Sequence, residues 1–227
     1  MAASRAHNDA DPAAGAASGL LRRGLLQGST VLLALAGDGP QAGSPAAHTQ
    51  LALADLGADV WTCEVLGAGG AAGEEELDRE VRRAHAQCGR IDMLFVDGAG
   101  IFDAVGASRA SLAVCLQAAW NVTRALAGDA LIPHGGGRIV YLAPAPGAGP
   151  HAQPARAGLE NLCRTLSIEW ARHAITTVTI APAAATAPDE VAAVVAYLCS
   201  AAGAYFSGCV LDMGGDEGRS DGSTRDR

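Results

Sequence analysis

Lysine is absent from the sequence, and all 16 basic residues among its 227 are arginine. This absence excludes chemistry that needs a lysine amine, including Schiff-base catalysis and the phosphate-binding lysine of a P-loop. Positive charge is also scarce: the net charge is −8, which argues against a nucleic-acid partner or an anionic membrane surface. Long apolar runs are missing too, so we expect no membrane-spanning segment.

Aromatic residues make up only 4% of the chain, so the core of one α/β domain must be built from alanine, valine and leucine. No continuous hydrophobic segment opens the N-terminus, and no C-x-x-C pair occurs. Both features favour a cytoplasmic protein whose six cysteines are buried thiols. His85 and Cys88 share a helix face, but the sequence offers no second pair of ligands and therefore predicts no metal site.

Short apolar runs alternate with helical patterns, which predicts a parallel, doubly wound sheet in an α/β fold. The first helix has the clearest start and stop signals, since Ser44 can cap it, Pro45 can begin it and Gly57 can end it. The third strand is followed by Asp97-Gly-Ala-Gly100, and segment 143–154 is expected to be a loop. The expected strands are 30–36, 59–65, 91–96, 138–142, 176–180 and 209–213, and the later helices are 74–87, 110–126, 156–172 and 189–198.

A single domain is expected over residues 29–216. The small and polar residues of segment 1–28 predict a flexible N-terminal segment, and the charged residues 217–227 predict a disordered tail.

The order and spacing of six segments resemble the short-chain dehydrogenases/reductases, which implies their Rossmann-like fold. The segments are GDGPQAG at 37–43, GRIDMLFVDGAG at 89–100, GGGRIVYLAP at 135–144, ARAGLENLCRTLSIEWA at 155–171, ITTVTIAP at 175–182 and FSGCVLDMGG at 206–215.

The catalytic positions that this resemblance implies carry other residues. The family's tyrosine falls on Ala152 and its lysine on Arg156, within the frame Y-x-x-x-K-A-G. Its serine falls in the neighbourhood of Ala143 and Pro144, and its helical asparagine falls on Cys115. In the family the tyrosine hydroxyl moves a proton while a hydride is transferred, so the resemblance implies no catalytic residue in this chain.

Two other residues are candidates to replace the missing tyrosine. Tyr141 lies on the strand before the missing serine and is interpreted as a packed strand residue. His151 adjoins the tyrosine position and is interpreted as a loop residue.

The cofactor loop is vestigial under the same resemblance. Gly37, Gly39 and Gly43 persist, but Pro40 stiffens the loop and Pro45 removes an N–H from the start of the helix. We therefore expect no cofactor on this chain.

Two further parts of the family pattern are shortened. Residues 65–89 leave room for about one helix where the family has a helix, a strand and a second helix. Glu64 could mimic an acidic ribose contact but is interpreted as a strand end. The substrate lid is also reduced, because Pro182 runs almost directly into the helix near Glu190. The expected fold is thus truncated, with one strand–helix unit and the lid reduced.

The helices at 110–126 and 156–172 and the terminal segment through Gly215 correspond to the family's subunit interfaces and persist. The chain resembles the silent subunit of aminocoumarin pathways of the novobiocin type. That resemblance implies a heterotetramer with an active paralogue that carries NADP. The paralogue would oxidise a β-hydroxytyrosyl thioester, tethered to a carrier protein, to the β-keto form.

Two alternatives remain open. Arg156 in place of lysine resembles the halohydrin dehalogenases, which share the fold and use no nucleotide, and implies an enzyme of altered chemistry. The second alternative is a homomeric module that binds a small molecule in the remaining cleft.

The vestigial loop generates a first prediction. The isolated chain should not bind NAD(P)H tightly, because Pro45 and the shortened segment 65–89 remove contacts to the dinucleotide. Calorimetry or a fluorescence titration measures this, and a low-micromolar dissociation constant would contradict it.

Overall fold

The computed structural model describes residues 4–5, 21–106 and 108–214. The expected tail at 217–227 and most of the expected flexible segment at 1–28 lie outside these residues. Within that segment, β1 (Ser4–Arg5) pairs antiparallel with the strand at Asp59–Glu64, and Leu26 is 2% exposed. At least these parts of segment 1–28 therefore pack against the domain.

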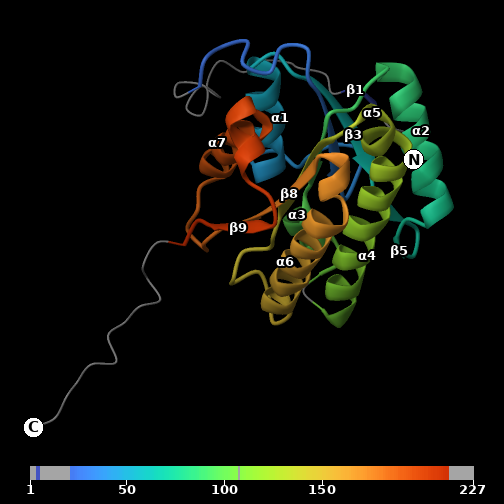
Figure 1. Ribbon diagram of the computed structural model, residues 1–227. Coiled ribbons are helices and arrows are strands. Elements are labelled where there is room, and N and C mark those ends of the chain that lie inside the picture. Colours follow the sequence, from blue (N-terminus) through green and yellow to red (C-terminus); the bar gives the residue numbers. More distant parts are fainter. Residues whose placement is uncertain (1–3, 6–20, 107, 215–227) are drawn as a thin grey trace, which may run out of the picture.

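A twisted sheet with strand order β1-β3-β2-β6-β7-β8-β9 forms the centre of the described chain (Figure 1). All pairings from β3 to β9 are parallel, as the sequence pattern predicted. The parallel strands are β2 (Thr30–Leu35), β3 (Asp59–Glu64), β6 (Met93–Val96), β7 (Gly137–Leu142), β8 (Ile175–Ala181) and β9 (Cys209–Asp212).

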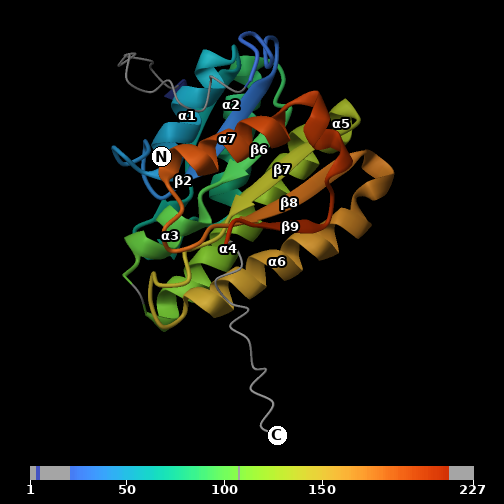
Figure 2. The same ribbon diagram turned by 90° about the vertical axis from the view of Figure 1, so that its left-hand side faces the viewer.

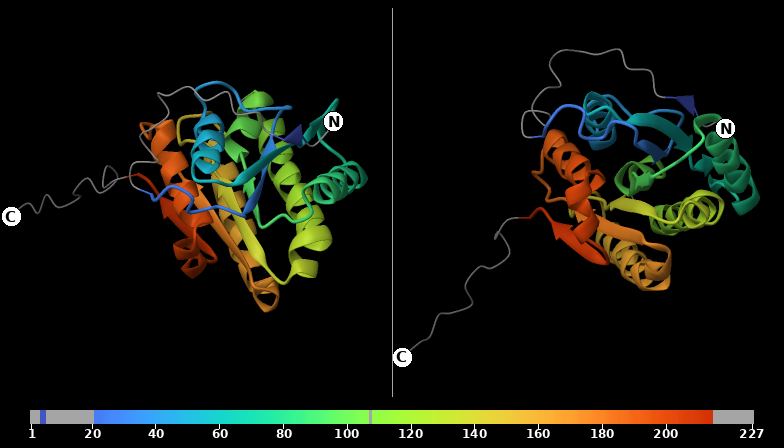
Figure 3. Two further views of the ribbon diagram at one scale, coloured as in Figure 1. Left: turned by 90° about the horizontal axis from the view of Figure 1, so that it is seen from above. Right: turned by 45° about the horizontal axis from the view of Figure 1, so that its top comes forward.

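Helices cover both faces of the sheet (Figures 2 and 3). On one face α1 (Pro45–Asp55) packs against α7 (Pro188–Cys199), and on the other α4 (Arg109–Leu126) lies between α2 (Glu74–Cys88) and α6 (Ala152–Glu169). None of the described helices is long and apolar enough to cross a membrane. The shorter helical segments are α3 (Gly98–Ala104), η1 (Ala127–Leu131), α5 (Ile132–His134), η2 (Ala171–His173) and η3 (Ala201–Tyr205).

Two hydrophobic cores lie on the two sides of the sheet. Successive side chains of a strand point to opposite faces, so Leu32 and Ala34 enter the core under α2, α4 and α6. Val31, Leu33 and Leu35 enter the core under α1 and α7. Every one of these side chains is at most 1% exposed, which explains the continuous apolar run at 30–36.

The first helix begins and ends where its capping residues predicted. The Ser44 hydroxyl accepts a hydrogen bond from the Ala47 N–H at 3.2 Å, and Pro45 is the first helical residue. Gly57 has a φ of 93°, a left-handed conformation that glycine adopts without steric cost and that ends helices.

The helix α3, which the sequence patterns did not predict, begins directly after β6, and Asp97 caps its N-terminus. Its carboxylate accepts a hydrogen bond from the Gly100 N–H at 3.0 Å. The expected helix at 156–172 is shifted, since α6 begins at Ala152 and ends at Glu169. Pro154 lies in the first turn of α6, where no intrahelical N–H donor is required.

Both expected truncations are present. Between β3 and β6 the chain forms only a small hairpin, β4 (Leu66–Gly67) and β5 (Gly70–Ala71), followed by α2. The antiparallel strand β1 occupies the sheet edge beside β3. Between β8 and α7, residues 182–187 contain no helix or strand, so little chain is available to cover a substrate.

Close packing at the start of α3 generates a prediction. A Cβ atom at Gly98 would lie 2.6 Å from the Leu142 carbonyl oxygen and 2.9 Å from a Leu159 methyl carbon. Gly98→Ala should therefore lower the free energy of unfolding by about 1–3 kcal/mol. Gly128→Ala is the matched control: a Cβ there meets nothing within 4 Å, and stability should hold or rise. Equal chemical-denaturation midpoints for the two variants would contradict the close packing.

Candidate functional site

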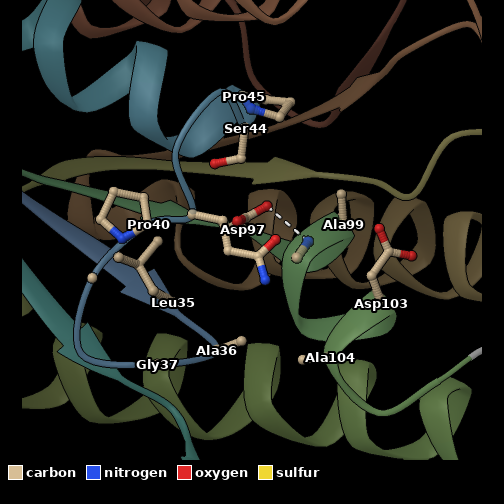
Figure 4. A pocket seen from close by; sticks show the side chains of 13 residues that line it. Leu35, Ala36, Gly37, Pro40, Ser44, Pro45, Asp97, Ala99, Asp103 and Ala104 are labelled. Atoms are coloured by element: carbon tan, nitrogen blue, oxygen red, sulfur yellow. Dashed lines mark hydrogen bonds between the residues drawn. The ribbon is translucent and has the colours of Figure 1, made fainter.

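A cavity of about 410 Å³ opens at the carboxyl ends of β2 and β6 (Figure 4). The chain runs from β2 outward to β3 and then returns to β6 on the other side, so the cavity lies at the point where the strand order reverses. Ligands of doubly wound folds bind at this crevice. The residues that line it are Leu35, Ala36, Gly37, Gly39, Pro40, Gln41, Ser44, Pro45, Asp97, Ala99, Gly100, Asp103 and Ala104.

The cavity does not fit the phosphates of a dinucleotide. Of the three glycines of the loop, Gly37 and Gly39 line the cavity, whereas Gly43 lies outside the lining. Pro45 removes one N–H from the start of α1, and the Ser44 hydroxyl is engaged with the Ala47 N–H. The lining contains carboxylates and no basic side chain, so charge complementarity to a pyrophosphate is absent.

Asp97 is the most perturbed titratable group of the cavity. Its side chain is 6% exposed, and burial raises the pKa of its carboxyl from 3.8 to about 6. The hydrogen bond from the Gly100 N–H opposes the increase, while the nearby Asp103 carboxylate adds to it. Figure 4 places this carboxylate beside the start of α3, facing the loop that carries Pro40 and the first residue of α1, Pro45.

The catalytic positions of the family pattern lie in a closed part of the structure. Ala152 is completely buried at the start of α6. The Arg156 side chain, 8% exposed, donates hydrogen bonds to the Pro144 carbonyl at 2.7 Å and the Pro182 carbonyl at 2.9 Å. The guanidinium therefore joins the chain after β7 to the chain after β8, and no tyrosine stands beside it.

Cys115, at the asparagine position, also has a packed environment. Its thiol donates to the Gly98 carbonyl at 3.4 Å, and burial raises the thiol pKa to about 12. A thiol in this state is not a nucleophile at neutral pH.

Tyr141 is a packed strand residue, as interpreted from the sequence. It is completely buried, and its hydroxyl lies 3.0 Å from the Thr123 hydroxyl. Burial raises the pKa of the phenol, and the side chain has no route to a substrate. His151 lies in the turn before α6, half-buried, as a loop residue would.

Metal ligands do not gather in threes or more anywhere in the part of the chain that the structure describes. The six cysteines are free thiols, four of them buried: Cys63, Cys115, Cys163 and Cys199.

A second feature is an apolar groove of about 730 Å³ on the outer surface of α4 and α6. Trp120 and Trp170 both line it, each half-buried. The helices approach closely at Gly158, where an added Cβ would lie 2.6 Å from the Leu116 side chain. We call this surface the α4/α6 groove; its residues are Leu116, Trp120, Gly158, Asn161, Leu162, Thr165, Leu166, Glu169 and Trp170.

The perturbed carboxyl generates a pH prediction. Between about pH 4 and pH 6 the folded chain binds more protons at Asp97 than the unfolded chain, so its stability falls as pH rises. Asp97→Asn keeps a side-chain oxygen for the cap but cannot titrate. Its stability relative to the unmodified chain should therefore increase by roughly 3 kcal/mol from pH 4 to pH 7. Urea unfolding across this range measures it, and parallel pH profiles would contradict the burial of this charge.

No protein-family model and no curated protein sequence matches the chain. Solved structures do match it in fold. A hydroxysteroid dehydrogenase from Escherichia coli shares 17% identity at a TM-score of 0.67, covering 83% of this chain and 96% of its own. A citronellol catabolism dehydrogenase from Pseudomonas aeruginosa shares 24% identity at 0.68, covering 86% and 96%. A Burkholderia xenovorans protein described as a short-chain dehydrogenase/reductase shares 18% identity at 0.65, covering 83% and 95%. The chain therefore has the Rossmann-like α/β fold of short-chain dehydrogenase/reductase structures.

Proposed function

We propose that the chain is a non-catalytic subunit of a hetero-oligomer, in which it supports an active NAD(P)-dependent paralogue. One observation carries the proposal: Arg156 is buried and donates to two backbone carbonyls beside a fully buried Ala152. A hydride transfer in this fold needs a proton donor at that place, and an alanine methyl group cannot supply a proton.

The cleft supports the same conclusion. Hydride transfer also needs a nicotinamide dinucleotide, whose phosphates require N–H donors or cations. The cavity offers Asp97 and Asp103 instead, together with prolines at positions 40 and 45. Chemistry and cofactor are therefore assigned to the partner, with NADP held there.

The α4/α6 groove is the surface we assign to the partner. It is lined by two tryptophans and three leucines, and Glu169 is the one ionisable residue of this lining. Ile168, which also lies on α6, is 78% exposed. Contiguous apolar surface of this kind marks protein interfaces. A paralogue of the same fold would present the matching helices, and two such pairs give a heterotetramer.

The partner's substrate class rests on the resemblance to the silent subunits of aminocoumarin pathways. We infer a β-hydroxytyrosyl thioester on a carrier protein. In such a partner, NADP⁺ would accept the β-hydrogen as hydride, and a general base of the partner would accept the hydroxyl proton.

A small-molecule binding module is the second candidate, favoured by the 410 Å³ cavity and its buried Asp97. The alternative based on Arg156 has less support. It would be a nucleotide-independent enzyme resembling the halohydrin dehalogenases, but the Arg156 guanidinium already donates to two carbonyls. Purification of the chain alone and together with the paralogue separates the candidates. A binding module is soluble and homomeric alone, whereas a partner subunit co-purifies in a fixed ratio.

Charge placed in the groove tests the interface. Trp120→Glu and Trp170→Glu should each weaken the complex by roughly 100-fold or more, because a carboxylate would be buried without a partner. Leu25→Glu is the matched control, since Leu25 is 38% exposed and lies outside the groove. Sedimentation velocity of the mixed proteins measures assembly. Assembly unaffected by either tryptophan change would overturn this interface.

Restoring the family pattern should not restore turnover. Ala152→Tyr combined with Arg156→Lys places the phenol in a fully buried site and removes the bonds to Pro144 and Pro182. Overpacking of this kind costs about 1–3 kcal/mol, so the double variant should melt at a lower temperature. Reduction of a model ketone by NADPH is the assay. Clear turnover at unchanged stability would show that the site retains catalytic capacity.

A further inference from the structure

A line of polar pairs joins α2 to the continuous helix formed by α4, η1 and α5. Asp78 accepts from Arg124 at 2.7 Å, and Arg82 lies 3.3 Å from the Asp129 carboxylate. The third pair is His85 and His134, whose Nε2 atoms are 3.3 Å apart. Each pair takes one member from each helix, so the three together define a seam between them.

The π-helical turn η1 keeps this seam in register. On α2, Asp78 and Arg82 are four residues apart, and Arg82 and His85 are three residues apart. These spacings place the three side chains on one face of an α-helix. The opposing residues 124, 129 and 134 are five apart, and in a regular α-helix each would be rotated by about 140° from the last. Within η1 the Ile132 N–H bonds to the Ala127 carbonyl, five residues back, and this wider turn keeps the three on one side.

Pro133 gives a physical reason for the wide turn. Proline has no N–H to donate, and its ring would clash with the carbonyl four residues earlier in an α-helix. The wider turn relieves this clash, and Gly135 then ends the helix in a left-handed conformation with φ of 81°. His134 is thereby fixed in the last turn, opposite His85.

The two imidazoles are spaced as ligands of one metal ion. Zinc–nitrogen bonds of about 2.0–2.1 Å at a tetrahedral angle place two ligand nitrogens about 3.3–3.4 Å apart. The observed separation of the Nε2 atoms is 3.3 Å, with ring centroids 4.8 Å apart and ring planes at 62°. Both rings are solvent-accessible, and a cavity of about 340 Å³ adjoins His134, so water can complete the coordination.

We propose that His85 and His134 form a two-histidine site for a late divalent transition metal such as Zn²⁺, joining α2 to α5. The site goes beyond the subunit role and does not depend on it. Cys88 is three residues from His85, but its thiol contacts the Arg90 carbonyl at 3.3 Å instead of facing the pair. No third His, Cys, Asp or Glu completes a cluster in the described residues. The site is therefore an open one, unlike a closed structural zinc site.

Metal binding should stabilise the fold, because the site exists only when the two helices pack. With the chain first stripped by a chelator, ZnCl₂ at 100 times its dissociation constant should raise Tm by about 5 °C or more. Calorimetry should give one ion per chain at this site. Mg²⁺, which prefers oxygen ligands, should have no effect.

Single variants identify the ligands. His85→Ala and His134→Ala should each abolish the Zn²⁺-induced rise in Tm, while His48→Ala, on α1, should retain it. His85→Gln provides a second variant that keeps a hydrogen-bonding side chain at the seam. Two results would overturn the proposal: no Tm shift with the unmodified chain, which would leave only a hydrogen bond between the rings, or an undiminished shift in either alanine variant.

Discussion

The hydrogen bonds from Arg156 to the Pro144 and Pro182 carbonyls are the constraint on which the arrangement around the family's catalytic positions depends. A buried cation must be hydrogen-bonded, and the planar fork of a guanidinium can reach two acceptors at once. These bonds join the carboxyl ends of β7 and β8 at the place where a catalytic tyrosine and lysine would meet. They also hold the start of α6, so Ala152 packs into the core instead of lining a cleft.

This closed site and the open α4/α6 groove lie on the same two helices. One end of α6 carries the buried Ala152 and Arg156, while its outward side carries the apolar surface that we assign to a partner. The remaining cavity lies at the carboxyl ends of β2 and β6 and contains Asp97, an acidic residue with a raised pKa, and no basic side chain that could bind phosphate. Under the proposed function, this division would let the fold keep an assembly surface without catalytic groups.

Sequence patterns predicted the parallel sheet and α1 because local signals and burial agree there: Ser44, Pro45 and Gly57 punctuate the helix, and β2 is apolar on both faces. Other features depend on contacts between distant residues. Nothing near Asp97 in the sequence distinguishes a helix cap from a turn, so α3 was not predicted. The two-residue strand β1 has no periodicity to detect. The contact of His85 with His134 spans 49 residues and depends on the wide turn before Pro133. The substitutions at positions 152 and 156 were readable from motif spacing, but the carbonyl acceptors of Arg156 were not.

The central claim is that this chain contributes no catalytic group to its complex. The most direct test replaces the catalytic tyrosine of the active paralogue with phenylalanine and measures NADP-dependent turnover of the assembled complex, with this chain unmodified. The account predicts that turnover falls to the uncatalysed background, because every acid–base group at the family's positions in this chain is missing or buried. Residual turnover that disappears when Asp97 or Tyr141 is replaced would contradict it.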